Sequence, residues 1–165
     1  MKKIIIIFSL IILGLIGLMF LGKGQQKNTN SSLDSNLSNL LTPSEMMYDF
    51  GNISMRDGLV THIFQVQNLS EQDVNLSKLY TSCMCTEAYL IQSDGNKIGP
   101  FGMQGMGFMP KVNEVIKTGD SRDIEVVYDP NAHGPAGVGV INRFILLEDL
   151  NGGELQLEVR ANVTP

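Results

Sequence analysis

The sequence predicts an all-β domain, folded as an antiparallel two-sheet sandwich of about seven strands and preceded by one N-terminal transmembrane helix. Three observations lead to this prediction. Short segments between residues 43 and 165 alternate apolar with polar residues, which is typical of half-buried strands. Beyond the apolar N-terminal run, no segment keeps a 3.6-residue apolar period for three turns. Gly, Pro, Asn and Asp separate the apolar segments at short intervals, and this spacing favours a sandwich.

The N-terminal run predicts a membrane segment over residues 1–24. Residues 4–22 carry no charge and only Ser9 as a polar residue, and a helix of this length spans roughly 28 Å, close to the bilayer core. The length favours an uncleaved signal anchor, and a cleaved signal peptide is the alternative. Lys2 and Lys3 precede the run, so the positive-inside rule leaves the rest of the chain outside the cytoplasm. We therefore expect an extracytoplasmic domain, periplasmic or at the cell surface.

Residues 25–42 are polar and rich in Asn and Ser, and we interpret them as a flexible linker. Leu37, Leu40 and Leu41 have the spacing of a short helical turn, but we assign no element there. The folded domain is then expected to occupy residues 43–165.

Strands follow from the alternation and from the turn residues. Val60, His62, Phe64 and Val66 share one parity, so we expect His62 to be a partly buried histidine on the core side. The apolar run 138–147 predicts a central strand buried on both faces. Asn151-Gly152-Gly153 predicts a hairpin connection to the last strand. Further strands are predicted over residues 74–80, 88–91, 123–128 and 155–163.

Composition excludes several classes of function. The chain carries 12 Lys and Arg against 17 Asp and Glu and has no basic run, which argues against binding of nucleic acid. The glycine-rich segment 99–107 lacks the Lys-Ser/Thr ending of a phosphate-binding loop. A Cys–His dyad is a conceivable catalytic group, but no motif supplies an oxyanion hole, so we expect a protein that is not an enzyme.

The most unusual local feature is a Cys-x-Cys-Thr motif with Met84 between the two cysteines. Over about residues 48–163 the chain resembles the bacterial domain of unknown function 1573 family, and the resemblance is carried by the motifs Cys83-x-Cys85-Thr86, Asp49-Phe50-Gly51-x-Ile53, His62-x-Phe64-x-Val66-x-Asn68 and Asp129-Pro130. The resemblance implies an Ig-like sandwich of the Hydin and major-sperm-protein type, and the family has no established activity. This chain departs from the pattern at Met84, where Gly is more usual, and in an apparent insertion over residues 99–110.

Two interpretations of Cys83 and Cys85 remain open. If both lie on one strand, they face the same side with Cα atoms roughly 6.5–7 Å apart, at the upper limit of disulfide geometry. They are then half-buried thiols or a strained disulfide at a strand end. Alternatively, they bind a soft metal ion.

A methionine repeat supports the metal interpretation. Met103, Met106 and Met109 recur at every third residue, so an extended polyproline-like path would align their thioethers along one edge. Thiolates and thioethers select Cu(I), and His133 would add an imidazole ligand if its loop folds near the cysteines. The alternative is an adaptable hydrophobic loop or a partner-binding surface. A zinc site is less favoured, because the usual two-pair ligand spacing is missing.

The sequence thus leaves two functional hypotheses. The first is a membrane-tethered, non-enzymatic binding or scaffolding module of the cell envelope, with no required cofactor and with an envelope protein as its partner. The second is binding or delivery of copper(I) through six candidate ligands: Cys83, Cys85, Met103, Met106, Met109 and His133.

Overall fold

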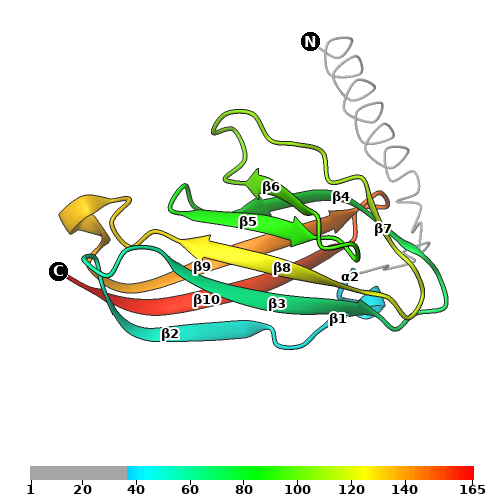
Figure 1. The fold of residues 1–165 in the computed structure, drawn as a ribbon, viewed down its shortest axis with the longest axis horizontal. Helices are drawn as coiled ribbons and strands as arrows, with labels where there is room; N and C mark the ends of the chain where they lie inside the picture. Colours follow the sequence, from blue (N-terminus) through cyan, green and yellow to red (C-terminus); the bar gives the residue numbers. More distant parts are fainter. Residues whose placement is uncertain (1–36) are drawn as a thin grey trace, which may run out of the picture. The chain divides into compact units, whose positions relative to one another are not determined.

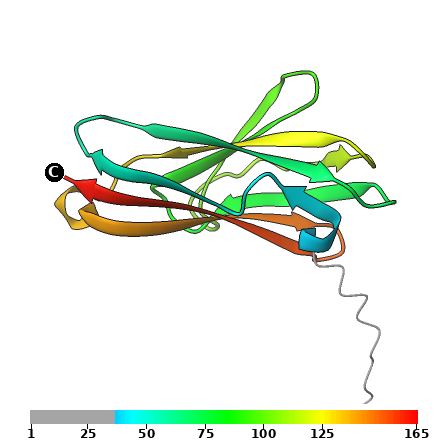
Figure 2. The same ribbon diagram turned by 90° about the horizontal axis from the view of Figure 1, so that it is seen from below.

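The computed structural model of the chain describes residues 37–165, which form two five-stranded β-sheets packed face to face (Figures 1 and 2). The membrane segment predicted over residues 1–24 and the first part of the predicted linker lie outside the described residues. Within residues 37–165, no helix has the length and apolar character needed to cross a membrane.

The elements follow one another with short connections. In chain order they are α2 (Leu37–Leu40), β1 (Leu41–Pro43), β2 (Met47–Ser54), β3 (Val60–Asn68), β4 (Val74–Thr81), β5 (Thr86–Ile91), β6 (Lys97–Phe101), β7 (Glu114–Ile116), β8 (Ser121–Tyr128), the 3-10 helix η1 (Gly134–Gly137), β9 (Gly139–Asp149) and β10 (Glu154–Thr164). The all-β prediction is confirmed for these residues, although the strands are ten rather than about seven. The unpredicted strands include β1 and β7, and three residues are too few to display an alternating pattern.

The first sheet has the strand order β1-β3-β8-β5-β6, and the second has the order β2-β10-β9-β4-β7. Neighbouring strands are antiparallel except for β2 and β10, which pair in parallel. The purely antiparallel prediction is therefore wrong at this pair. Its cause is the connection between Pro43 and Met47, which carries the chain from the first sheet into the second without a hairpin.

The core lies between the sheets and is built from the alternate residues of each strand. In β10 the alternation is complete, with Leu155, Leu157 and Val159 buried and the intervening residues facing outward, as predicted. Burial of each such side chain contributes roughly 1.5–3 kcal/mol.

Residues 37–42 belong to this domain rather than to a linker. Leu37 and Leu41 are 0% exposed and sit in the same apolar cluster as the central strands. Leu37–Leu40 form the short helix α2, and Leu41 pairs with Asn68 of β3. The sequence did not predict that this segment contributes to the core, because it holds only three leucines among polar residues.

Strand β9 is central in its sheet but is not buried on both faces as predicted. Ile141, Ile145 and Leu147 point into the core, whereas Val140 on the other face is 81% exposed. A two-layer sandwich covers only the inner face of each sheet, so centrality within the sheet does not bury the outer face. The hairpin at residues 151–153 is confirmed, and the Asp149 carboxylate there accepts bonds from two backbone N–H groups of the turn.

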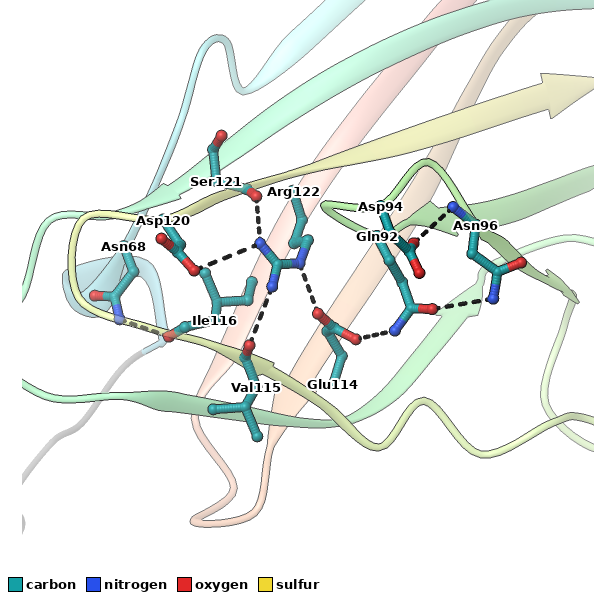
Figure 3. A network of polar contacts seen from close by, with 10 residues as sticks. All are labelled: Asn68, Gln92, Asp94, Asn96, Glu114, Val115, Ile116, Asp120, Ser121 and Arg122. Atoms are coloured by element: carbon teal, nitrogen blue, oxygen red, sulfur yellow. Dashed lines mark hydrogen bonds and ion pairs between the residues drawn. The ribbon is translucent and has the colours of Figure 1, made fainter.

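A buried ion pair closes one end of the sandwich (Figure 3). Arg122 Nε of β8 donates to Glu114 Oε1 of β7 at 2.6 Å, and the guanidinium also donates to two backbone carbonyls. Gln92, just beyond β5, donates to the second Glu114 oxygen. The network therefore ties the second sheet to the first at the start of β8. The cysteines lie beyond the other end of β8, where Tyr128 pairs with Thr86.

Candidate functional site

Two connections between the sheets meet at one end of the sandwich. Residues 82–85 join β4 in the second sheet to β5 in the first, and residues 129–138 join β8 in the first sheet to β9 in the second. The Asp129 N–H donates to the Cys85 carbonyl at 2.9 Å, which holds the two connections together. Both lie toward the end of the domain that carries the C-terminus (Figure 1).

The two cysteines lie in a turn rather than on a strand. The Thr81 hydroxyl donates to the carbonyls of Cys83 (3.1 Å) and Thr86 (2.8 Å), and the Thr86 N–H donates to the Cys83 carbonyl at 3.1 Å. The turn brings the Cys85 N–H to 3.5 Å from Cys83 Sγ, so the sulfurs converge for a reason other than strand parity. Both cysteines are free thiols, and the disulfide considered from the sequence is not formed in this structure.

The second connection supplies His133. Its Nε2 lies 3.2 Å from Cys83 Sγ, as the metal interpretation of the sequence required. Asp129 Oδ1 accepts from the Asn131 N–H at 2.8 Å, and the Gly134 N–H donates back to Asn131, so the loop is folded tightly before η1. His133 immediately precedes this helix.

The ligand atoms of Cys83, Cys85 and His133 all lie within 4.8 Å of one another. The three residues differ in exposure, since Cys85 is buried, Cys83 is half-buried and His133 is exposed. The group is therefore open to solvent on the histidine side and closed on the side of Cys85.

Arg143 of β9, in the second sheet, contacts the sulfur of Cys85. Its Nε donates to Cys85 Sγ at 3.0 Å, and its Nη1 donates to the Asn142 carbonyl at 2.8 Å. Arg143 shares the core-facing parity of Ile141 and Ile145, so its guanidinium reaches the site between the sheets. Sequence reasoning missed it, although a charged residue at that parity in an apolar run was a visible signal.

The surroundings of the two thiols shift their pKa values in opposite directions. Burial raises the pKa of Cys83, but hydrogen bonds from Cys85 and His133 and the charge of Arg143 more than offset this effect and lower the pKa to about 7. Burial and the bond to Cys83 raise the pKa of Cys85, against the opposing influence of Arg143. Cys83 is thus the thiol that ionises first.

An apolar cluster forms the floor of the site. Its buried members are Cys85, Tyr128, Ile53, Ile141, Ala161 and Val163. Half-buried Cys83 packs against this cluster, as do Met55, Phe50 and Val60. A shallow pocket of about 160 Å³ opens beside Cys85.

The methionine loop takes a different path from the predicted one. The Met106 N–H donates to the Met103 carbonyl at 3.2 Å, which closes a turn in which Gly105 has a φ of +83°. The predicted polyproline-like path is therefore wrong. Met103 pairs with Thr81 in an isolated bridge, and Met106 is 55% exposed. The apolar cluster around Cys85 includes Met55 but none of Met103, Met106 and Met109, whose role as ligands stays a prediction.

His62 behaves as a satisfied histidine, as expected. It is half-buried, its ring stacks on Tyr48 with centroids 3.5 Å apart, and its Nε2 lies 2.8 Å from Glu45 Oε1. It takes no part in the cysteine site.

Two thiols and one imidazole form a donor set with clear chemical preferences. Thiolates select soft ions, and three such donors suit trigonal Cu(I) or three of the four positions around Zn²⁺. The residues present therefore fit a soft metal ion.

Fold and site together define a two-sheet β-sandwich domain, consistent with an Ig-like sandwich, that carries a Cys-Cys-His group in two connections at one end. Residues 41–97 match the family described as "Protein of unknown function (DUF1573)", so the resemblance stated from the sequence is confirmed over these residues. No curated protein matches the chain.

Solved structures support the fold. A protein of unknown function from Porphyromonas gingivalis W83 is 15% identical, with a TM-score of 0.54, and the match covers 74% of this chain and 46% of that one. The secreted serine protease VesC from Vibrio cholerae is 16% identical, with a TM-score of 0.51, and the match covers 82% of this chain and 26% of that one. The match thus takes in less than half the length of either structure, and at these identities the likeness shows the fold alone.

Proposed function

We propose that this chain is an extracytoplasmic β-sandwich domain that binds Cu(I) through Cys83, Cys85 and His133 and is held at the membrane by residues 1–24. The observation that carries the proposal is the convergence of the three ligand atoms within 4.8 Å of one another, from connections 50 residues apart in the chain.

The lowered pKa of the Cys83 thiol favours metal binding near neutral pH. Metal binding requires deprotonated thiols, and the pKa of Cys83, lowered to about 7, makes one thiolate available without a large proton cost. The exposed His133 leaves a route for an incoming ion, while the buried Cys85 holds it away from solvent. An accessible site of this kind suits reversible binding, which delivery of copper also requires.

The test is a Cu(I) competition titration on the reduced, purified full chain under anaerobic conditions. We expect one-to-one binding with a sub-nanomolar dissociation constant, abolished in the double variant Cys83→Ser, Cys85→Ser. The matched control is Met84→Leu, a volume-conserving change of an exposed side chain between the two cysteines. Weak binding that persists in the double variant would contradict the proposal.

A second candidate function is a binding or scaffolding module that contacts an envelope protein. The observation that favours it is the loop between β6 and β7, where Phe108 is 92% exposed and Met106 also faces solvent. Replacement of both residues by Ser should abolish cross-links to the partner in the cell envelope. The double cysteine variant should keep those cross-links, which separates this function from metal binding.

A further inference from the structure

We infer that Arg143 determines the charge selectivity of the cysteine site and favours a monovalent soft ion over a divalent one. This inference rests on the proposed metal-binding function and adds a residue that is not itself a ligand. It starts from a guanidinium that donates to Cys85 Sγ at 3.0 Å and is held on its other side by the Asn142 carbonyl.

The charges of the site balance for a monovalent ion. Two thiolates contribute two negative charges, a histidine ligand is neutral, and Arg143 contributes one positive charge. A monovalent ion such as Cu(I) completes a neutral group, whereas Zn²⁺ leaves one net positive charge. Because Cys85 is only 2% exposed, an uncompensated charge beside it is costly.

Other charged groups near Cys85 do not cancel this effect. Glu87 and Asp129 line the same shallow pocket. The Glu87 carboxylate is exposed and accepts from the Tyr89 hydroxyl, and the Asp129 carboxylate accepts from the Asn131 N–H. Glu87 is exposed and Asp129 is half-buried. Both carboxylates are present in the wild type and in every Arg143 variant, so they do not alter the effect of changing Arg143. Buried Tyr128 is neutral at physiological pH.

Repulsion between the guanidinium and the bound ion grows with the charge of the ion. At a separation of about 6 Å and an effective dielectric constant of about 20, one extra unit charge corresponds to roughly a hundredfold loss of affinity. Solvent on the open side of the site screens the charge and reduces this loss toward about tenfold. Since thiolates prefer Cu(I) in any case, the informative quantity is the change in the ratio of Cu(I) to Zn²⁺ affinity when Arg143 is altered, rather than the ratio itself.

The experiment measures dissociation constants for Cu(I) and for Zn²⁺ on the reduced full chain. In Arg143→Gln we expect the Cu(I) preference to fall about ten- to hundredfold, chiefly through tighter Zn²⁺ binding, because the positive charge is gone. Arg143→Lys keeps the charge and should leave the ratio within about threefold of wild type. Arg160→Gln is the matched control, since it removes the same charge from the outward face of the neighbouring strand.

A second variant protects the test against misfolding of Arg143→Gln, which circular dichroism would reveal. Ala132 is exposed and lines the pocket beside Cys85, so Ala132→Asp adds a negative charge without disturbing the core. It should shift the ratio toward Zn²⁺ in the same direction. A ratio that ignores the charge at both positions would overturn the inference while leaving cysteine-dependent Cu(I) binding intact. Absence of any cysteine-dependent binding would instead overturn the proposed function, and the inference with it.

Discussion

The sulfur of Cys83 lies 3.2 Å from Nε2 of His133, although 50 residues separate them in the chain. The contact exists because the β4–β5 and β8–β9 connections both cross between the sheets at the same end, where Thr86 pairs with Tyr128. The pairing of β5 with β8 therefore fixes the site, and the site has the rigidity of the sandwich beneath it.

His133 should contribute measurably to metal affinity. Loss of an outer-shell partner of a metal site typically costs about ten- to a hundredfold in affinity, and loss of a direct ligand should cost at least as much. We expect His133→Ala to weaken Cu(I) binding by about a hundredfold with the one-to-one stoichiometry retained. The competition titration measures this, and an unchanged affinity would remove His133 from the ligand set.

The methionine repeat can be tested separately from the cysteines. The apolar cluster that contains Cys85 includes Met55 and none of the three methionines of the repeat. We therefore expect the triple variant Met103→Leu, Met106→Leu, Met109→Leu to keep Cu(I) affinity within about threefold of wild type, because Leu conserves the volume of Met. A loss of tenfold or more would return the loop to the ligand set.

Cys83 should react before Cys85 as the pH rises. Because the pKa of Cys83 is lowered to about 7 and that of Cys85 is raised, alkylation of Cys83 by iodoacetamide should reach half its maximal rate near pH 7. Cys85→Ala removes the side-chain hydrogen bond that stabilises the Cys83 thiolate, while the backbone N–H of residue 85 remains, and should move this midpoint to higher pH. Mass spectrometry of each cysteine-containing peptide follows the two rates. Equal rates at pH 7 would contradict the assigned order of ionisation.

The α2–β1 segment should contribute to stability. Leu41 is fully buried, so Leu41→Ala should lower the free energy of unfolding by about 2–5 kcal/mol. Leu69→Ala provides the control, since Leu69 is exposed and its loss should change stability by less than about 0.5 kcal/mol. Urea unfolding of both variants measures the difference. Equal stabilities would place residues 37–42 in a linker after all.

The ion pair between Arg122 and Glu114 should show strong coupling. Arg122→Met leaves the Glu114 carboxylate buried without its charged partner, which should cost about 3–5 kcal/mol. Adding Glu114→Gln removes that buried charge, so the double variant should be less destabilised than the sum of the two single variants. Chemical denaturation of the four proteins completes the cycle. Strict additivity would mean that the two side chains act independently.

The candidate site was only partly predictable from the sequence. The Cys-x-Cys motif and His133 could be chosen as ligands, since their chemistry is evident from residue type. Arg143 was overlooked, because the run 138–147 was interpreted as apolar on both faces. Arg143 has the same parity as Ile141 and Ile145, which face the core. The extended path predicted for the methionine repeat was wrong, since equal spacing does not enforce such a path when glycines at positive φ permit a turn.

By itself the sequence determined the buried face of the strands that alternate clearly. Alternation in β3 and β10 specifies one buried face, because successive side chains on a strand point to opposite sides, and that rule is local. Only the tertiary structure decided that Cys83, Cys85, His133 and Arg143 meet. Their proximity depends on which strands pair and where the chain crosses between sheets, and these long-range choices are set by packing of the whole core rather than by any local pattern.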